Sequence, residues 1–140
     1  MKHLNEAKEE LVELMFKGLD HGISSIQDSE GFLIAFALFQ EGKEIKIVRF
    51  ATEQIEDGPK QAEQYLRTLV TKPELAIIAY EGIVSIENEQ SDAVIIEGFD
   101  KTDSEGYVLA QRFNRKTADS NFESIGNAGF FGNCPNIFRG

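Results

Sequence analysis

The sequence has few of the residues that form covalent cross-links or soft-metal sites. Cys134 is its single cysteine, and His3 and His21 are its two histidines. One cysteine excludes an intrachain disulfide, and this usage suits a reducing compartment, so we expect a cytoplasmic protein. A structural zinc site takes four cysteine or histidine ligands, which argues against a zinc site here. Because no histidine lies near Cys134 in the sequence, nucleophilic catalysis by this thiol is not expected.

Long hydrophobic runs and positive charge are also scarce. The longest apolar run, Phe32 to Phe39, has eight residues, whereas a membrane-spanning helix needs roughly 20. The first ten residues, MKHLNEAKEE, are charged and lack the apolar stretch of a secretory signal. Lysine and arginine total 14 against 24 aspartates and glutamates, a net charge of −10. We therefore expect neither nucleic acid nor an anionic membrane surface as a partner.

The composition is that of a folded globular protein. The chain has 140 residues, of which 41% are hydrophobic and 27% charged, whereas disordered chains combine low hydrophobicity with high net charge. A chain of this length buries roughly 68–70% of its unfolded surface and needs no covalent staple. Because neither an internal repeat nor a linker interrupts the sequence, we expect one domain over residues 1–140.

Two segments have the apolar periodicity of amphipathic helices. Apolar residues spaced by three and four predict a first helix over residues 5–19, which Gly22 would end as a left-handed cap. A second helix is predicted to begin near Asp57, where Pro59 suits the first turn. Pro73 marks the end of this second pattern.

Five strands are predicted, over residues 31–40, 44–50, 75–87, 93–99 and 106–114. The first is apolar without alternation, as in strands covered on both faces. The second alternates, which predicts a half-exposed strand after a tight turn at Glu41-Gly42. Gly82 predicts a bulge or turn in the third strand. The last three strands have short connections and therefore predict an antiparallel meander.

The C-terminal segment, residues 118–140, differs from the rest of the chain. It is rich in glycine and asparagine, which argues against a helix or a strand. It also contains four phenylalanines, at positions 122, 130, 131 and 138, which would prefer burial to exposure. We therefore expect an irregular segment that packs on the body of the protein or on a partner chain.

These elements predict an α+β protein with two main helices and a five-stranded antiparallel sheet, in the order α-β-β-α-β-β-β. This order resembles that of profilin-like domains and of roadblock or longin domains. Five short segments resemble a group of uncharacterised small bacterial α+β proteins: GFLIAF at 31–36, VRF at 48–50, AYEGIVS at 79–85, SDAVIIE at 91–97 and AQRF at 110–113. The second resemblance implies a bacterial fold with no assigned activity, and it transfers no catalytic residue.

Polar residues inside the last predicted hairpin are the best candidates for a site. If Phe99 pairs with Tyr107, then Glu97 and Arg112 lie on opposite faces of the sheet, whereas a shift of one residue places them on the same face. We prefer a structural role for them, as cross-strand pairs or partners of backbone groups. The residues that would bind a ligand are Glu81, at the predicted kink of the third strand, together with Glu97 and Arg112.

Two other motifs do not fit the sites that they superficially match. The acidic residues of the loop DKTDSEG, Asp100, Asp103 and Glu105, lack the alternating spacing of a calcium-binding loop, so no metal is expected. The glycines of GNAGFFGN are not followed by a helix start, as a phosphate-binding loop requires. We therefore predict neither a catalytic residue nor a cofactor.

The sequence thus predicts a protein-interaction or dimerisation module rather than an enzyme. If both helices covered one face of the sheet, the other face would have to meet the C-terminal segment or a second subunit. We therefore expect a homodimer or a complex with another protein. The alternative is a small-molecule-binding domain or an enzyme that uses the polar residues of the last hairpin.

Overall fold

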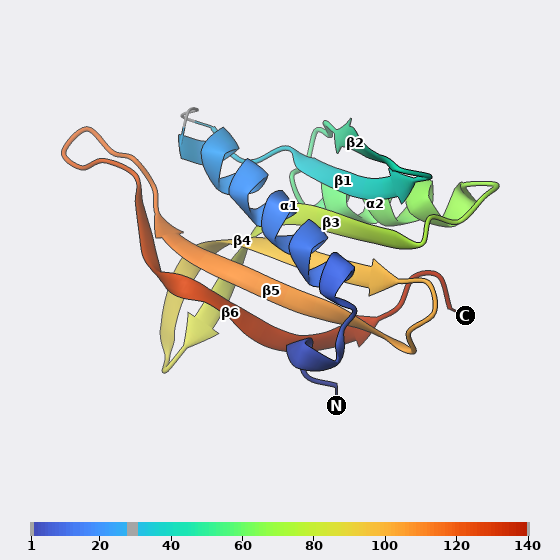
Figure 1. Ribbon diagram of the computed structural model, residues 1–140. Helices are drawn as coiled ribbons and strands as arrows, with labels where there is room; N and C mark the ends of the chain where they lie inside the picture. The colour runs from blue at the N-terminus through green and yellow to red at the C-terminus, as the bar shows by residue number, and fades with distance from the viewer. Residues whose placement is uncertain (1, 28–30, 140) are drawn as a thin grey trace.

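The computed structural model describes residues 2–27 and 31–139, while residues 1, 28–30 and 140 lie outside this description. Its elements are the 3₁₀ turn η1 (Leu4–Glu6), helix α1 (Glu9–Gln27), strands β1 (Ala35–Glu41) and β2 (Glu44–Phe50), helix α2 (Asp57–Thr68), and strands β3 (Leu75–Ile86), β4 (Glu89–Asp100), β5 (Glu105–Asn114) and β6 (Glu123–Pro135) (Figure 1). All neighbouring strands are antiparallel, in the order β2-β1-β3-β4-β5-β6. The predicted α+β class and antiparallel sheet are confirmed.

The sheet has six strands, so the prediction of five was wrong. The sixth strand, β6, lies in the segment that was predicted to be irregular, and it pairs with β5 at the edge of the sheet. Its pairing shifts register twice, and positive φ angles at Gly126 and Gly132, 64° and 109°, let the backbone bulge there. Glycine that weakens a regular strand is tolerated here because an edge strand bonds to one neighbour only.

Helix α1 begins later and runs further than the prediction of residues 5–19. Gly22 lies inside the helix and does not cap it. A Cβ atom at Gly22 would lie 2.9 Å from Val94 Cγ1, and one at Gly18 would lie 2.6 Å from Ile77 Cδ1. These glycines therefore allow α1 to approach the sheet closely. Helix α2 begins at the predicted Asp57.

Two turn predictions had different outcomes. The tight turn after Glu41 is confirmed, with Gly42 at a φ of 64° and a direct pair between Glu41 and Glu44. The predicted bulge at Gly82 is wrong, because Gly82 pairs with Ala93 in an unbroken ladder between β3 and β4. The Cδ1 atom of Ile95 lies 2.6 Å from where a Cβ of Gly82 would be. This glycine makes room for a neighbouring side chain.

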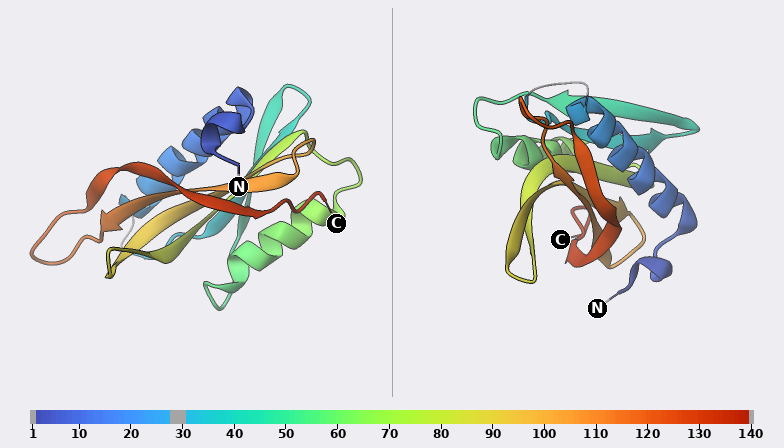
Figure 2. Two further views of the ribbon diagram at one scale, coloured as in Figure 1. Left: turned by 90° about the horizontal axis from the view of Figure 1, so that it is seen from below. Right: turned by 90° about the vertical axis from the view of Figure 1, so that its left-hand side faces the viewer.

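The two helices cover opposite faces of the sheet (Figure 2), not the single face that the sequence led us to expect. We call these the α1 face and the α2 face. The core of the α1 face joins α1 to all of the central strands through Leu11, Met15, Phe36, Ile77, Ile96, Tyr107, Leu109 and Phe113. The core of the α2 face contains Ala37, Phe39, Ala62, Leu66, Ala76, Ile78, Phe99 and Ile137. Both faces therefore have a packed core within one chain.

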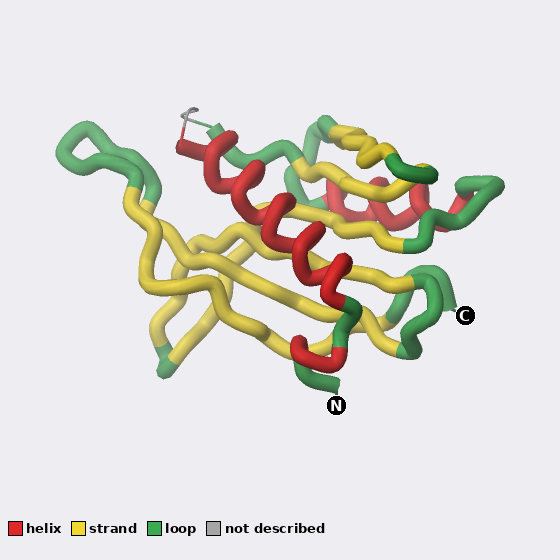
Figure 3. The backbone as a smooth tube through the Cα atoms, in the orientation of Figure 1, coloured by secondary structure: helices red, strands yellow, loops and turns green. Residues whose placement is uncertain are grey.

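The shorter helix α2 packs mainly on β1, β2 and β3. The chain after β6 supplies Ile137 and Phe138 to the same core, with the ring of Phe138 edge-on to that of Phe99. At the end of the sheet opposite the β4–β5 turn, the β3–β4 turn and the loop between β5 and β6 project beyond both helices (Figure 3). Neither helix of the described residues is long and apolar enough to cross a bilayer.

Candidate functional site

The strand register determines where the three predicted ligand-binding residues lie. Gly98 pairs with Tyr107. This pairing is shifted by one residue from the pair of Phe99 with Tyr107, and it is the second of the two registers that the sequence left open. Glu97 and Arg112 therefore share the α2 face. Glu81 pairs with Val94, whose side chain belongs to the core of the α1 face. Among residues 2–27 and 31–139, no hydrogen bond or ion pair joins any two of the three.

Glu81 forms a buried junction between β3 and the segment before β1. Its side chain is 6% exposed, accepts a hydrogen bond of 3.1 Å from the backbone N–H of Leu33, and forms an ion pair with Arg115. Arg115 also donates a bond of 3.0 Å to the carbonyl of Gly31 and lies over the ring of Phe32. Burial raises the pKa of Glu81, although Leu33 and Arg115 act in the opposite direction. This junction fastens the start of β1 to the sheet.

Glu97 forms a second polar contact, on the α2 face. The hydroxyl of Tyr80 donates a hydrogen bond of 2.5 Å to Glu97 Oε2. Burial is the main cause that raises the pKa of both groups. Cys134 lies close enough to interact with both, and burial raises the pKa of its thiol to about 12. At neutral pH Cys134 is therefore a thiol and a poor nucleophile.

The raised pKa of Glu97 predicts a pH effect on stability. The folded state holds the Glu97 proton more tightly than the unfolded state does, so the stabilisation is present at low pH and is lost as pH rises through the folded-state pKa. We expect Glu97→Gln, which keeps an oxygen acceptor for Tyr80, to raise the free energy of unfolding at pH 8 by about 1 kcal/mol. At pH 4 the two proteins should be equally stable.

Urea denaturation at both pH values measures this difference. Glu89→Gln is the matched control, because Glu89 lies in the same strand but is exposed. The prediction is contradicted if Glu97→Gln is less stable than the natural chain at pH 8, or if the difference does not depend on pH.

Arg112 differs from the other two predicted residues because its guanidinium has no hydrogen-bonding or ionic partner within the described ranges. Its side chain is half-buried and lines a cavity of about 470 Å³ at the point where β4 and β5 separate. Asp92 lines the same cavity from β4. The sequence analysis named Arg112 as a candidate ligand-binding residue, but Asp92 was not among the candidates.

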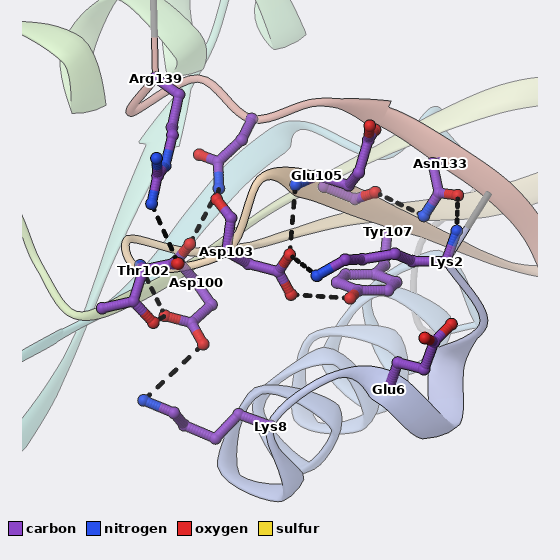
Figure 4. A network of polar contacts seen from close by, with 12 residues as sticks. Lys2, Glu6, Lys8, Asp100, Thr102, Asp103, Glu105, Tyr107, Asn133 and Arg139 are labelled. Atoms are coloured by element: carbon purple, nitrogen blue, oxygen red, sulfur yellow. Dashed lines mark hydrogen bonds and ion pairs between the residues drawn. The ribbon is translucent and has the colours of Figure 1, made fainter.

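The acidic loop between β4 and β5 fastens the two ends of the chain (Figure 4). Asp103 accepts hydrogen bonds from Lys2 Nζ at 2.8 Å and Tyr107 Oη at 2.7 Å. Burial alone would oppose ionisation, but the bonds from Lys2 and Tyr107 hold the pKa of Asp103 below its usual value. Asp100 accepts bonds from the backbone and hydroxyl of Thr102. In the described part of the chain, no group of three or more histidine, cysteine, aspartate or glutamate side chains is placed to hold a metal ion.

The opposite edge of the sheet, strand β2, and the segment before β1 carry exposed apolar side chains. We define the β2 strip as Phe32, Ile34, Ile45 and Ile47, which are 65%, 50%, 42% and 37% exposed. Ile47 pairs with Leu38, so it lies on the α1 face, where α1 does not cover it. A hollow of about 320 Å³ beside Phe32 and Ile34 continues the strip toward Ile55.

The two edges of the sheet differ in regularity. Strand β2 pairs with β1 without interruption from Glu44 to Phe50, so its outer edge is a regular row of backbone groups. Strand β6, at the other edge, is bulged. Regular edges tend to pair with further strands, whereas bulges oppose such pairing. The combination of a regular edge and apolar side chains is therefore found at β2.

Comparison of the chain with models of protein families, with curated proteins and with solved structures finds no match. The resemblances to profilin-like, roadblock and longin domains and to small bacterial α+β proteins therefore stay predictions. The surfaces of the molecule itself are the basis for assigning a function.

Proposed function

We propose that the protein is a dimerisation module without catalytic activity, and that two copies join along β2. The observation that carries this proposal is the β2 strip beside a regular sheet edge. Ile45 and Ile47 on this edge, with Phe32 and Ile34 in the segment beside it, are exposed apolar side chains that favour contact with a partner over contact with water. A second copy offers the same strip and the same edge, which suits a two-fold symmetric contact.

The hydrogen-bonding pattern of β2 is compatible with such a contact. In a two-residue hairpin the residues that flank the turn, here Glu41 and Glu44, bond to each other through their backbones. Backbone groups then alternate, so those of Ile45, Ile47 and Arg49 point away from β1. A two-fold axis perpendicular to the sheet therefore joins two β2 strands as an antiparallel pair and keeps the α1 faces of both copies on the same side.

Charge favours one register of this pair. A register centred on Ile45 places Glu44 opposite Lys46 of the second copy. A register centred on Lys46 places this residue opposite itself, where like charges repel. In the favoured register the two Ile45 side chains lie opposite each other, with both copies of the β2 strip on the same face.

Charge reversal along β2 tests the proposal. Glu44→Lys or Lys46→Glu alone should weaken the dimer about tenfold, because each change turns two attractive pairs into repulsive ones. The double variant Glu44→Lys with Lys46→Glu should restore the affinity. Light scattering over a dilution series measures each dissociation constant.

Glu87→Lys, in the exposed β3–β4 turn, is the control for the change in net charge and should leave the dimer intact. A protein that is monomeric at all concentrations contradicts the dimer. A dimer that none of the substitutions affects contradicts the assignment to β2.

A further inference from the structure

Strands β4 and β5 separate at one end of the sheet. They pair from Gly98 opposite Tyr107 to Ala93 opposite Arg112, and no pair joins them beyond that point. Strand β4 nevertheless continues to Glu89, paired with β3, and β5 continues to Asn114, paired with β6. The β3–β4 turn and the β5–β6 loop consequently point in different directions (Figures 1 and 2).

The space between the separated strands is the cavity of about 470 Å³, a volume within the range of roughly 300–1,000 Å³ that is usual for small-ligand sites. Apolar side chains from three strands line it: Ile83 from β3, Phe113 from β5 and Ile125 from β6. Arg112 and Asp92 line it as well, although the register assigns them to opposite faces. Both reach the cavity because it opens where the sheet divides.

The charges of Arg112 and Asp92 are not used elsewhere in the structure that is described. Neither the guanidinium nor the carboxylate has a hydrogen-bonding or ionic partner there, and both side chains are half-buried. The nearby Arg115 is committed to Glu81 and to the carbonyl of Gly31. Half-buried charges without partners are costly, so a cation and an anion in one cavity indicate a ligand that pairs with both.

The two groups are also close along the backbone. Asp92 is next to Ala93, which pairs directly with Arg112, and the Cα atoms of paired residues in an antiparallel ladder lie about 4.5–5.5 Å apart. Because both residues also line one cavity, a small ligand that carries a positive and a negative group can contact both. An α-amino acid has this arrangement, because its ammonium and carboxylate are attached to one carbon.

We propose that this cavity binds a small apolar α-amino acid as its zwitterion. Arg112 binds the carboxylate through its planar pair of N–H donors. Asp92 accepts hydrogen bonds from the ammonium group. The apolar side chain of the ligand packs against Ile83 and Ile125, which covers a side chain of β3 that is otherwise 65% exposed. Strand β1 lies between β2 and the strands that line this site, so the site does not depend on the proposed dimer.

Calorimetric titration of the full chain with three probes tests the assignment of each group. Leucine has both charges, N-acetylleucine lacks the ammonium, and leucinamide lacks the carboxylate. The natural chain should bind leucine at least tenfold more tightly than either derivative. Arg112→Gln removes the partner of the carboxylate, so this variant should bind leucine and leucinamide equally. Asp92→Asn removes the partner of the ammonium group, so this variant should bind leucine and N-acetylleucine equally.

Two controls make the result interpretable. Arg67→Gln removes an arginine that lies on α2, away from the cavity, and should bind leucine as the natural chain does. Circular dichroism and urea unfolding show whether each variant keeps its fold. The proposal is overturned if the folded natural chain does not bind leucine at 10 mM, a concentration chosen to detect weak sites. It is also overturned if neither variant changes the preference among the probes, or if a leucyl dipeptide binds as tightly as leucine.

Discussion

A chain that ends at Lys116 is expected not to fold. The truncation removes β6 and exposes the edge of β5 along its length. It also removes side chains from both cores: Phe122 and Phe130 pack on the α1 face, and Ile137 and Phe138 pack on the α2 face. A large apolar side chain contributes about 1.5–3 kcal/mol when fully buried, so four partly or fully buried ones approach the whole stability of a domain, about 5–15 kcal/mol.

Urea unfolding followed by circular dichroism measures this effect. The truncated chain should have no cooperative transition, whereas a chain that lacks only Ala118 and Asp119 should remain within about 1 kcal/mol of the natural one. These two residues are exposed in the loop before β6. A truncated chain that unfolds cooperatively at the natural midpoint would contradict the role assigned to β6.

Replacing Asn136 is expected to have the second largest effect. Asn136 is 2% exposed, and its Nδ2 donates to the carbonyls of Asp100 and Asp103 at 2.8 and 2.9 Å. Its Oδ1 accepts the backbone N–H of Phe138 at 2.9 Å. Asn136→Ala leaves three backbone groups without their partner and should cost about 2–3 kcal/mol.

Asn136→Asp should be more destabilising at pH 7, because a carboxylate would face two carbonyl oxygens and cannot donate to them. Burial and these oxygens favour the protonated acid, so the loss should decrease as the pH falls and the new carboxyl group gains a proton. The loss caused by Asn136→Ala should not show this recovery.

The control for the added charge is Asn127→Asp, because Asn127 is exposed in β6. Thermal unfolding at pH 5 and pH 7 compares the three variants with the natural chain. If Asn136→Asp and Asn127→Asp had equal effects, the buried amide of Asn136 would not have the role described here.

Local sequence patterns were enough to predict the elements that depend only on residues close together in the sequence. The bounds of β2 agree with the predicted residues 44–50, since alternation and a glycine turn are both local. Strand β6 was missed because its glycines and asparagines are typical of loops, and only pairing with β5 makes it a strand. The opposite placement of α1 and α2 was also missed, because amphipathic periodicity identifies the apolar side of a helix but not the face of the sheet that it covers.

The candidate sites show the same limit. The alternatives for the hairpin register included the correct one, and Arg112 was named as a binding candidate on its polarity alone. The partners of the other two residues were not predicted: Arg115 is 34 residues from Glu81, and Tyr80 is 17 residues from Glu97. Such pairs depend on which strands become neighbours, and no local motif contains that information.

The attachment of both chain ends to the β4–β5 turn has a mechanical consequence. Lys2 bonds to Asp103, and Arg139 donates a bond of 3.0 Å to the carbonyl of Thr102. A tension applied between the two ends would therefore load these few polar contacts before it reaches the ladders between strands. Once they and the buried contacts of Asn136, Ile137 and Phe138 break, the pull on the C-terminal end acts on Pro135 opposite Glu105, the first pair at that end of β6. The sheet would then open from its bulged edge one pair at a time, and shear would not load many pairs at once.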